Sequence, residues 1–154
     1  GCRCLDWVAA GAGSSEVVHR TLYRVHQRVA KTFRKGRVFL AGDAAHINNP
    51  LGGMGMNGGI HDAFNLTDRL AHVWMGMSDA AQLDLYDLQR RTVTMEAVQV
   101  QTIQNKKDME SADENDQAQF RNRLRNIMRD PEKNRAYLQR ISMIESLQRA
   151  AKIS

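Results

Sequence analysis

The glycines of this 154-residue chain are confined to its first half, and this distribution constrains the fold more than any other feature of the sequence. All eleven glycines lie at or before Gly76, and residues 77–154 contain none. Glycine supplies the left-handed conformations of tight turns and weakens helix interiors. The front of the chain is therefore predicted to be turn-rich and mixed in structure, and the back to be all helical.

The densest run of turn residues separates a short strand from a helix. Val38 to Ala41 is apolar on both faces, which is typical of a strand inside a sheet covered by helices. A loop with one proline and four glycines follows, and helical periodicity begins at Asn57 or Gly58. Successive glycines let backbone N–H groups turn toward a ligand, and the helix adds its positive end. The pattern predicts a ligand cradle.

A second strand is predicted over Val17 to Ala30, where β-branched and aromatic residues alternate in part with polar ones. Two strands alone are marginally stable, and a strand buried on both faces needs neighbours on both edges. The chain is thus expected either to dimerise or to be the C-terminal part of a longer protein, and the second alternative is favoured.

The first helix, ending at Trp74, carries an apolar face that is expected to pack on the sheet and a polar face that is expected to be solvated. The apolar face holds Ile60, Phe64, Leu66, Leu70, Val73 and Trp74, and the polar face holds His61, Asn65, Asp68, Arg69 and His72. Gly76 is expected to end this helix, and Ser78 or Asp79 to cap the next one.

The glycine-free half is predicted to contain three more helices. The first runs from about Ala80 to Met109 with apolar residues on more than one side, and a short one spans Phe120 to Met128. Asp130 then caps a last helix with Pro131 at its first position. That helix shows a regular stripe formed by Tyr137, Ile141, Ile144, Leu147 and Ala151.

Composition indicates an ordinary globular protein, for which a cytoplasmic location is the default. No run of eighteen apolar residues and no signal peptide is present, so no transmembrane segment is expected. The net charge is +5, but aromatic residues are only 6% and the basic residues are interspersed with acidic ones, so no nucleic-acid partner is expected. Cys2 and Cys4 supply neither a disulfide framework nor a zinc site.

The residues in and around the glycine loop give little support to other common kinds of ligand or catalytic site. The loop lacks G-K-[ST], which excludes a P-loop, and a dinucleotide fingerprint belongs in a first βαβ unit rather than before a helical tail. A metal site built from Asp43, His46, His61 and Asp62 is conceivable, but solvated side chains are the expectation and no metal is predicted. Cys2 and His19 have no context that would support a nucleophile pair.

The combination of loop residues resembles the second flavin signature of the single-component FAD-dependent aromatic hydroxylases, the family typified by para-hydroxybenzoate hydroxylase. The signature comprises Gly42-Asp43-Ala44-Ala45-His46, Pro50, Gly52-Gly53, Gly55, Asn57, Gly59-Ile60 and Asp62-Ala63. Downstream, Leu85-Tyr86 and Arg90-Arg91 resemble the tyrosine and paired arginines of the same family. The resemblance covers about Val17 to Ile103. The N-terminal G-x-G-x-x-G of the family is missing, so the chain resembles a C-terminal fragment.

The resemblance implies roles for individual residues. Asp43 would bind the ribityl hydroxyls of FAD, Pro50 would lie against the isoalloxazine ring, and backbone N–H groups from Gly52 to Asn57 would face the pyrimidine edge. The implied cofactor-binding set is Gly42, Asp43, Pro50, Gly52, Gly53, Met54, Gly55, Met56 and Asn57, with no certain catalytic residue. The residue types also suggest that His46 is a satisfied loop histidine and that Asn48-Asn49 serves turn chemistry.

Tyr86, Arg90 and Arg91 are expected to form scaffold that ties the long helix to the flavin-binding part, rather than to act as catalytic groups.

The implied fold class is α/β, the C-terminal portion of an FAD-binding domain with few strands followed by a mostly α-helical tail. Residues 1–16 are unassigned and flexible, 17–109 belong to the FAD-binding domain, and 110–154 form the tail. The implied function is part of a monooxygenase that hydroxylates an aromatic or phenolic substrate with NADH or NADPH and O2, through a flavin C4a-hydroperoxide.

Such a fragment is expected to be inactive alone, and a homo-oligomer is possible. Two alternatives stay open. One is a flavin enzyme of the same superfamily with another reaction, such as halogenation or epoxidation. The other is a non-catalytic helical interaction module.

Overall fold

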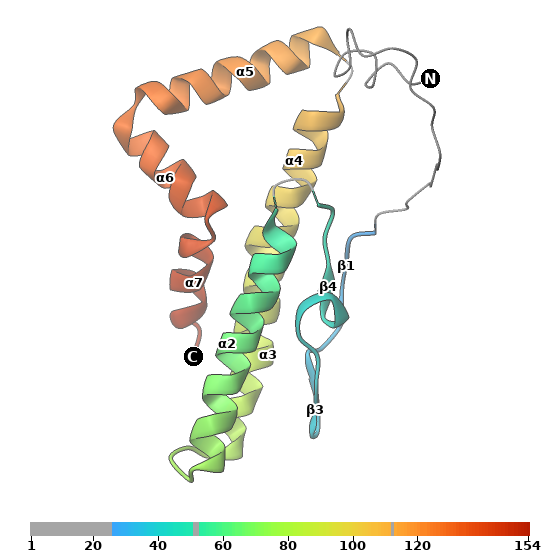
Figure 1. The fold of residues 1–154 in the computed structure, drawn as a ribbon, viewed down its shortest axis with the longest axis vertical. Helices are drawn as coiled ribbons and strands as arrows, with labels where there is room; N and C mark the ends of the chain where they lie inside the picture. Colours follow the sequence, from blue (N-terminus) through green and yellow to red (C-terminus); the bar gives the residue numbers. More distant parts are fainter. Residues whose placement is uncertain (1–25, 51–52, 112) are drawn as a thin grey trace, which may run out of the picture.

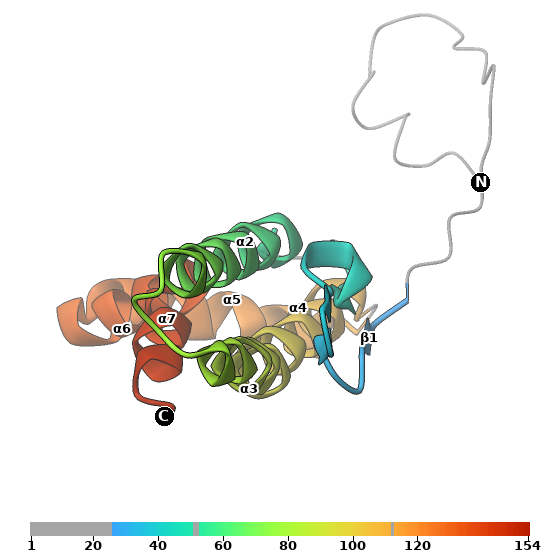
Figure 2. The same cartoon turned by 90° about the horizontal axis from the view of Figure 1, so that it is seen from below.

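The computed structural model describes residues 26–50, 53–111 and 113–154. Most of the predicted strand over 17–30, together with Cys2, Cys4 and His19, therefore lies outside the described residues, as does Gly52. Within the described ranges the protein is mostly helical with few strands, so the predicted fold class is confirmed. Helices α2 and α3 lie side by side, with the strands on one side of this pair and the tail helices on the other (Figures 1 and 2).

In the described part of the chain, four two-residue strands form two small antiparallel pairs. β1 (Arg28–Val29) pairs with β4 (His46–Ile47), and β2 (Arg34–Lys35) pairs with β3 (Val38–Phe39). In the first pair Val29 lies opposite His46, which brings the loop after β3 back beside β1. The turn between β2 and β3 contains Gly36 at φ +61°, a conformation that favours glycine.

The prediction that Val38 to Ala41 is buried on both faces is wrong for Val38, which is 64% exposed. The reason lies in the pairing. Among the described residues β3 has a single neighbour, β2, so one edge and part of one face of the strand remain open. The small core on the covered side contains Phe33, Ala45 and Tyr86, which are buried together.

Helix α2 (Met54–Trp74) begins three residues before the earlier of the two predicted starts and ends where predicted. Gly76 follows at φ +69°, and the Met77 N–H donates to the His72 carbonyl, so the glycine ends the helix as expected. Asp79 caps the following short helix η2 (Ala80–Leu83), because its side chain accepts a hydrogen bond from the Ala81 N–H.

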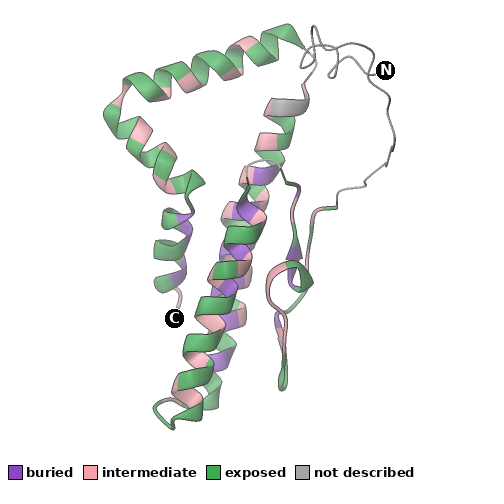
Figure 3. Ribbon diagram, in the orientation of Figure 1, coloured by how far each residue is buried: buried purple, intermediate pink, exposed green. Residues whose placement is uncertain are grey.

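The predicted packing face of α2 is wrong for four of its six residues, whereas Leu66 packs against the core of Phe33, Ala45 and Tyr86 as expected. The apolar side chains Ile60, Phe64, Leu70 and Trp74 are exposed, and Trp74 is 91% exposed. The buried positions of the helix are instead Met54, Gly58 and Asp62. Met54 packs with Val98 of the long helix and with Met143, whereas Gly58 lies beside His46. Gly58 and Gly59 let the loop after β3 approach the helix backbone closely, and the Asp62 carboxylate bonds to His46 and Arg90 on that side. Buried positions of α2 and of the long helix lie along the sides on which these helices meet (Figure 3).

The predicted long helix is continuous but not uniform. It consists of α3 (Asp84–Val93), a π-helical segment η3 (Thr94–Gln99) and α4 (Val100–Glu110). Five residues at a spacing of four are each no more than 1% exposed: Tyr86, Arg90, Thr94, Val98 and Thr102. The sequence pattern of the leucines and isoleucines does not reveal this buried face, because its members are mainly polar or aromatic.

The tail contains three helices, α5 (Glu114–Arg129), α6 (Pro131–Ile141) and α7 (Ile144–Ala151). Helix α5 is longer than the predicted Phe120 to Met128. Asp130 caps α6, with Pro131 at its first position, as predicted.

The predicted last helix is interrupted. Met143 adopts the left-handed conformation with φ +63°, and it is buried against Met54 and Val98. The predicted stripe is wrong because this break changes the direction of the helical faces, and Ile141, Ile144 and Leu147 are exposed. Among the described residues no helix has the length and hydropathy that a membrane span requires.

Candidate cofactor site

The end of β3 leads into a short 3-10 turn, η1 (Gly42–Ala44), which carries Asp43. Gly42 has φ +59°, and a Cβ built on Gly59 would lie 3.2 Å from the Gly42 Cα. The turn therefore lies directly against α2, and glycine is needed on both sides of this contact. The side chain of Asp43 points to solvent, and it makes no hydrogen bond or ion pair with other described residues.

The N-terminus of α2 is the second part of the site. Gly53 precedes the helix at φ +66°, its N–H donates to the Pro50 carbonyl at 3.1 Å, and no side chain caps the helix. Cβ atoms built on Gly53 and Gly55 would meet nothing within 4 Å, so the backbone is open there. The first N–H groups of a helix have no partners within the helix. Pro50, Met56 and Asn57 are exposed around these groups, whereas Met54 is buried.

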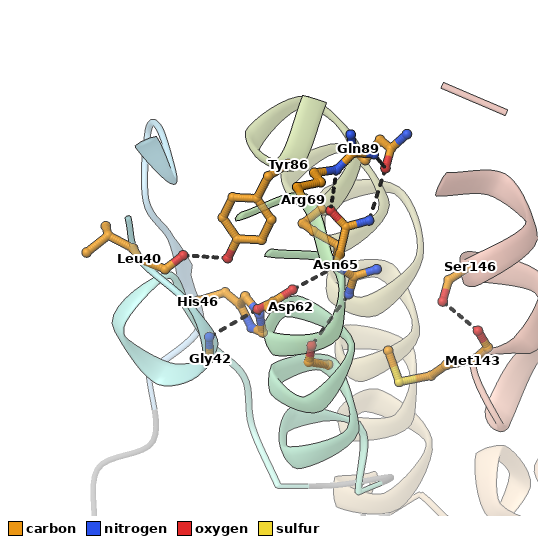
Figure 4. Close-up of polar contacts among 12 residues, drawn as sticks. Leu40, Gly42, His46, Asp62, Asn65, Arg69, Tyr86, Gln89, Met143 and Ser146 are labelled. Atoms are coloured by element: carbon orange, nitrogen blue, oxygen red, sulfur yellow. Dashed lines mark hydrogen bonds and ion pairs between the residues drawn. The ribbon is translucent and has the colours of Figure 1, made fainter. Parts of the chain in front are cut away.

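A fully buried carboxylate, Asp62, lies beside the Gly42 turn in the third turn of α2 (Figure 4). Its Oδ2 accepts hydrogen bonds from the Gly42 N–H at 3.1 Å and from His46 Nε2 at 2.7 Å. Its Oδ1 accepts from Arg90 Nε at 2.8 Å. Asp62 thus ties the turn that carries Asp43 to α2 and α3.

The surroundings of Asp62 favour the ionised form of its carboxyl group. Burial alone would raise the pKa of the carboxyl, but the hydrogen bonds from His46 and Arg90 outweigh it and lower the pKa below its usual range. Burial and the nearby Arg90 guanidinium also lower the pKa of His61. Gly58 has a steric role, since a Cβ at this position would lie 3.2 Å from His46 Cε1.

His46 is a buried structural histidine, as the sequence suggests, but the expectation that Asp62 is solvated is wrong. Among the described residues no group of three or more His, Cys, Asp or Glu side chains could hold a metal ion.

The tyrosine and arginines of α3 contact the strand–loop segment. The Tyr86 hydroxyl donates to the Leu40 carbonyl at 2.6 Å, and burial raises the pKa of this phenol. Arg90 is 1% exposed in its pair with Asp62, whereas Arg91 pairs with Asp87 at 3.2 Å and is partly exposed. These contacts agree with the scaffold role expected for the three residues.

Sequence reasoning missed the residues that hold the loop before Pro50. The side chain of Asn48 accepts from Gln99 Nε2 at 2.8 Å, and Asn49 Nδ2 donates to the Thr102 carbonyl at 2.9 Å. These contacts join positions about fifty residues apart, so they exceed the local turn chemistry expected of the two asparagines. The sequence carries no clear signal for them, because the residues buried at a spacing of four from Tyr86 to Thr102 share no residue type.

The described site residues fit a ligand with hydroxyl groups at one end and an electron-rich ring edge at the other. The exposed Asp43 carboxylate can accept two hydrogen bonds from a polyol. The open N-terminus of α2 offers N–H donors and about half a positive charge. Gly59 faces Gly42 and lies five residues into α2, so the two parts of the site are roughly 7 to 8 Å apart along the helix axis.

Comparison with known proteins identifies a family for this chain. The model of a family described as FAD binding domain matches residues 4–101. Para-nitrophenol 4-monooxygenase from Pseudomonas sp. (strain WBC-3) is 50% identical over 80 residues, which is 52% of this chain and 20% of that protein. The chain therefore spans about a fifth of the length of this curated relative.

Two solved structures resemble the fold. The p-nitrophenol 4-monooxygenase PnpA from Pseudomonas putida DLL-E4 matches with a TM-score of 0.72 and 38% identity, over 78% of this chain and 31% of that one. The Diels-Alderase PyrE3 of pyrroindomycin biosynthesis matches with a TM-score of 0.65 and 31% identity, over 75% of this chain and 24% of that one. The shared fold thus occurs in proteins named for different reactions.

Proposed function

Because this chain belongs to the FAD binding domain family, which matches residues 4–101, we propose that it forms the ring-binding part of an FAD-dependent aromatic hydroxylase. The single observation that carries the proposal is that the turn with Asp43 is fixed on α2 close to the uncapped N-terminus of that helix, through the contact of Gly42 with Gly59 and the bond from the Gly42 N–H to the buried Asp62. FAD, when bound, supplies the activation of O2 after reduction by NADH or NADPH.

In this proposal Asp43 holds the ribityl hydroxyls, and the backbone from Gly52 to Asn57 faces the pyrimidine edge of the ring. Gly42 makes the turn, and Pro50 lies near the ring face. The remaining contributors at the helix start are Gly53, Met54, Gly55 and Met56. The helix end favours negative charge on the ring by about 0.3 to 2 kcal/mol.

We further propose that the chain acts as part of a longer protein. Four large apolar side chains on one side of α2 are between 45% and 91% exposed: Met56, Ile60, Phe64 and Trp74. Exposed apolar patches of this kind mark surfaces that other structure covers. The matches cover only 20% and 31% of the two relatives, so their additional length offers such a cover. Residues 17–109 would then complete a larger FAD-binding domain, with 110–154 as its helical tail.

The substrate proposed is an aromatic or phenolic molecule, in keeping with the named substrate of the p-nitrophenol 4-monooxygenases. The match to PyrE3 favours a second candidate within the same framework. PyrE3 shares the fold at 31% identity and is named a Diels-Alderase, so a flavin-binding protein with a different reaction is the alternative. Product analysis with phenolic substrates, NADH or NADPH, and O2 separates the two.

The test of cofactor binding uses the full-length protein encoded by the gene that contains this chain. Wild type is expected to bind FAD, and Asp43→Ala to weaken binding by roughly 10- to 150-fold, the range for a lost hydrogen bond to a charged group. Asp84→Ala is the matched control, because this carboxylate is also exposed but belongs to α3. The proposal fails if wild type binds no FAD, or if the Asp43 and Asp84 variants bind it equally well.

A further inference from the structure

The two residues before Pro50 are held by the long helix rather than by their own loop. Asn48 accepts from Gln99 Nε2 at 2.8 Å and lies 3.4 Å from His46 Nδ1 through its Nδ2. Asn49 is 5% exposed and donates to the Thr102 carbonyl at 2.9 Å. The position of Pro50, which has no N–H of its own, therefore follows from these neighbours.

The side chain of Gln27 also bonds to Asn49 and to this part of the long helix. Gln27, beside β1, donates from Nε2 to the Gln99 carbonyl at 3.0 Å and to Thr102 Oγ1 at 2.6 Å. Its Oε1 accepts from Asn49 Nδ2 at 3.1 Å. Thr102 is 0% exposed and its bond from Asn49 is buried, whereas the three bonds of Gln27 are partly buried at the edge of the same group.

The π-helical segment explains why Gln99 and Thr102 face this loop. In an α-helix each step of four residues overshoots a full turn by about 40°, so Tyr86 and Thr102 would point about 160° apart. The wider i→i+5 turns of η3 (Thr94–Gln99) take up much of that rotation. All five residues from Tyr86 to Thr102 at this spacing consequently remain buried.

We propose that Gln99 is a positioning residue for the turn that carries Pro50, and that η3 is the element that aims it. This inference rests on the proposed flavin site. Gln99 would act through Asn48, and the same chain of contacts continues through His46 to Asp62 and the Gly42 N–H. One connected set of side chains would thus fix both the ribityl end and the ring end of the site.

The test compares Gln99→Met with Gln101→Met in the full-length protein. Both substitutions remove a half-buried amide of similar size, but Gln101 bonds to Asn105 within its own helix. Loss of one typical hydrogen bond corresponds to a roughly 2- to 12-fold change in an equilibrium. Amide hydrogen exchange over residues 46–49 should therefore accelerate by that factor in the Gln99 variant and stay unchanged in the Gln101 variant.

Two flavin readouts separate positioning from simple stabilisation. In Gln99→Met the visible absorption bands of bound FAD should shift, and product formed per nicotinamide oxidised should fall, with the remaining O2 reduced to hydrogen peroxide. Affinity for FAD should change far less than in Asp43→Ala. Gln99→Glu, which keeps the length but not the donor, should behave like the methionine variant.

The inference alone is overturned if wild type binds FAD but Gln99→Met has the spectrum and coupling of Gln101→Met. It is also overturned if exchange accelerates equally across the whole chain in both variants. A wild-type protein that binds no FAD overturns the proposed function, and the inference with it.

Discussion

The buried pair of Arg90 and Asp62 offers the sharpest test of how the site is held together. Arg90→Met keeps most of the side-chain volume but removes the 2.8 Å bond from Nε to Asp62 Oδ1. Both side chains are at most 1% exposed. Breaking a buried pair by removal of one partner costs about 3 to 5 kcal/mol, because the other charge is left uncompensated. At about 1.36 kcal/mol per decade, this corresponds to a roughly 150- to 5,000-fold change in an opening equilibrium.

Native-state hydrogen exchange in the full-length protein measures this opening directly. Amides from Gly42 to His46 and in the third turn of α2 should exchange faster by that factor. Arg91→Met is the matched control. Its pair with Asp87 is partly exposed, so it should cost no more than about 1 kcal/mol, roughly a fivefold change. A double variant that carries Asp62→Asn as well as Arg90→Met should recover part of the lost protection from exchange.

The reasoning is refuted if Arg90→Met and Arg91→Met accelerate exchange by similar amounts, or if the Arg90 effect stays below about tenfold.

Three further outcomes follow from the same packing. Gly59→Ala should destabilise the protein by about 1 to 3 kcal/mol, because its Cβ would meet the Gly42 backbone at 3.2 Å. Gly55→Ala should instead stabilise it by about 0.5 to 1 kcal/mol, since open space surrounds that helical position. Urea titrations of the two variants and wild type measure both changes. Since the folded-state pKa of Asp62 is lowered, its stabilisation is complete above the unfolded pKa of about 3.9 and is lost as pH falls through the folded value. The difference in unfolding free energy between wild type and Asp62→Asn should therefore be constant above about pH 5 and shrink below about pH 4 in acid titrations followed by circular dichroism. Tyr86→Phe should cost about 0.5 to 1.5 kcal/mol in thermal unfolding, through loss of its 2.6 Å hydroxyl bond alone.

The sequence predicted those features that depend on local chemistry. Gly76, Asp79, Asp130 and Pro131 mark helix ends through caps and turns whose partners lie within a few residues, and the structure confirms each of them. The strand–loop–helix order around Pro50 was also accessible, because glycine, proline and periodicity all change there.

Features that depend on partners far away in the chain could not be predicted from the sequence. Apolarity placed Ile60 and Phe64 in the interior, yet Asp62 takes that place because Arg90 and His46 satisfy its charge. A hydrophobic pattern carries no information about a partner twenty-eight residues away. The break at Met143 was missed for a related reason, since its left-handed conformation is held by burial of its side chain and not by a glycine or asparagine.

The π-helical segment has a consequence for how this region can change over evolutionary time. Removal of one residue from Thr94–Gln99 would turn its wide i→i+5 bonds into ordinary i→i+4 bonds and leave the helix on either side facing nearly the same way. By contrast, removal of one residue from α3 would rotate everything after it by about 100°. Thr102 would then turn away from the loop even if every side chain were kept. The turn between Gly76 and Asp79 is exposed and free of such a constraint, so insertions and deletions are tolerable there. Within the long helix, the fold therefore restricts the number of residues more tightly in α3 than in the π-helical segment.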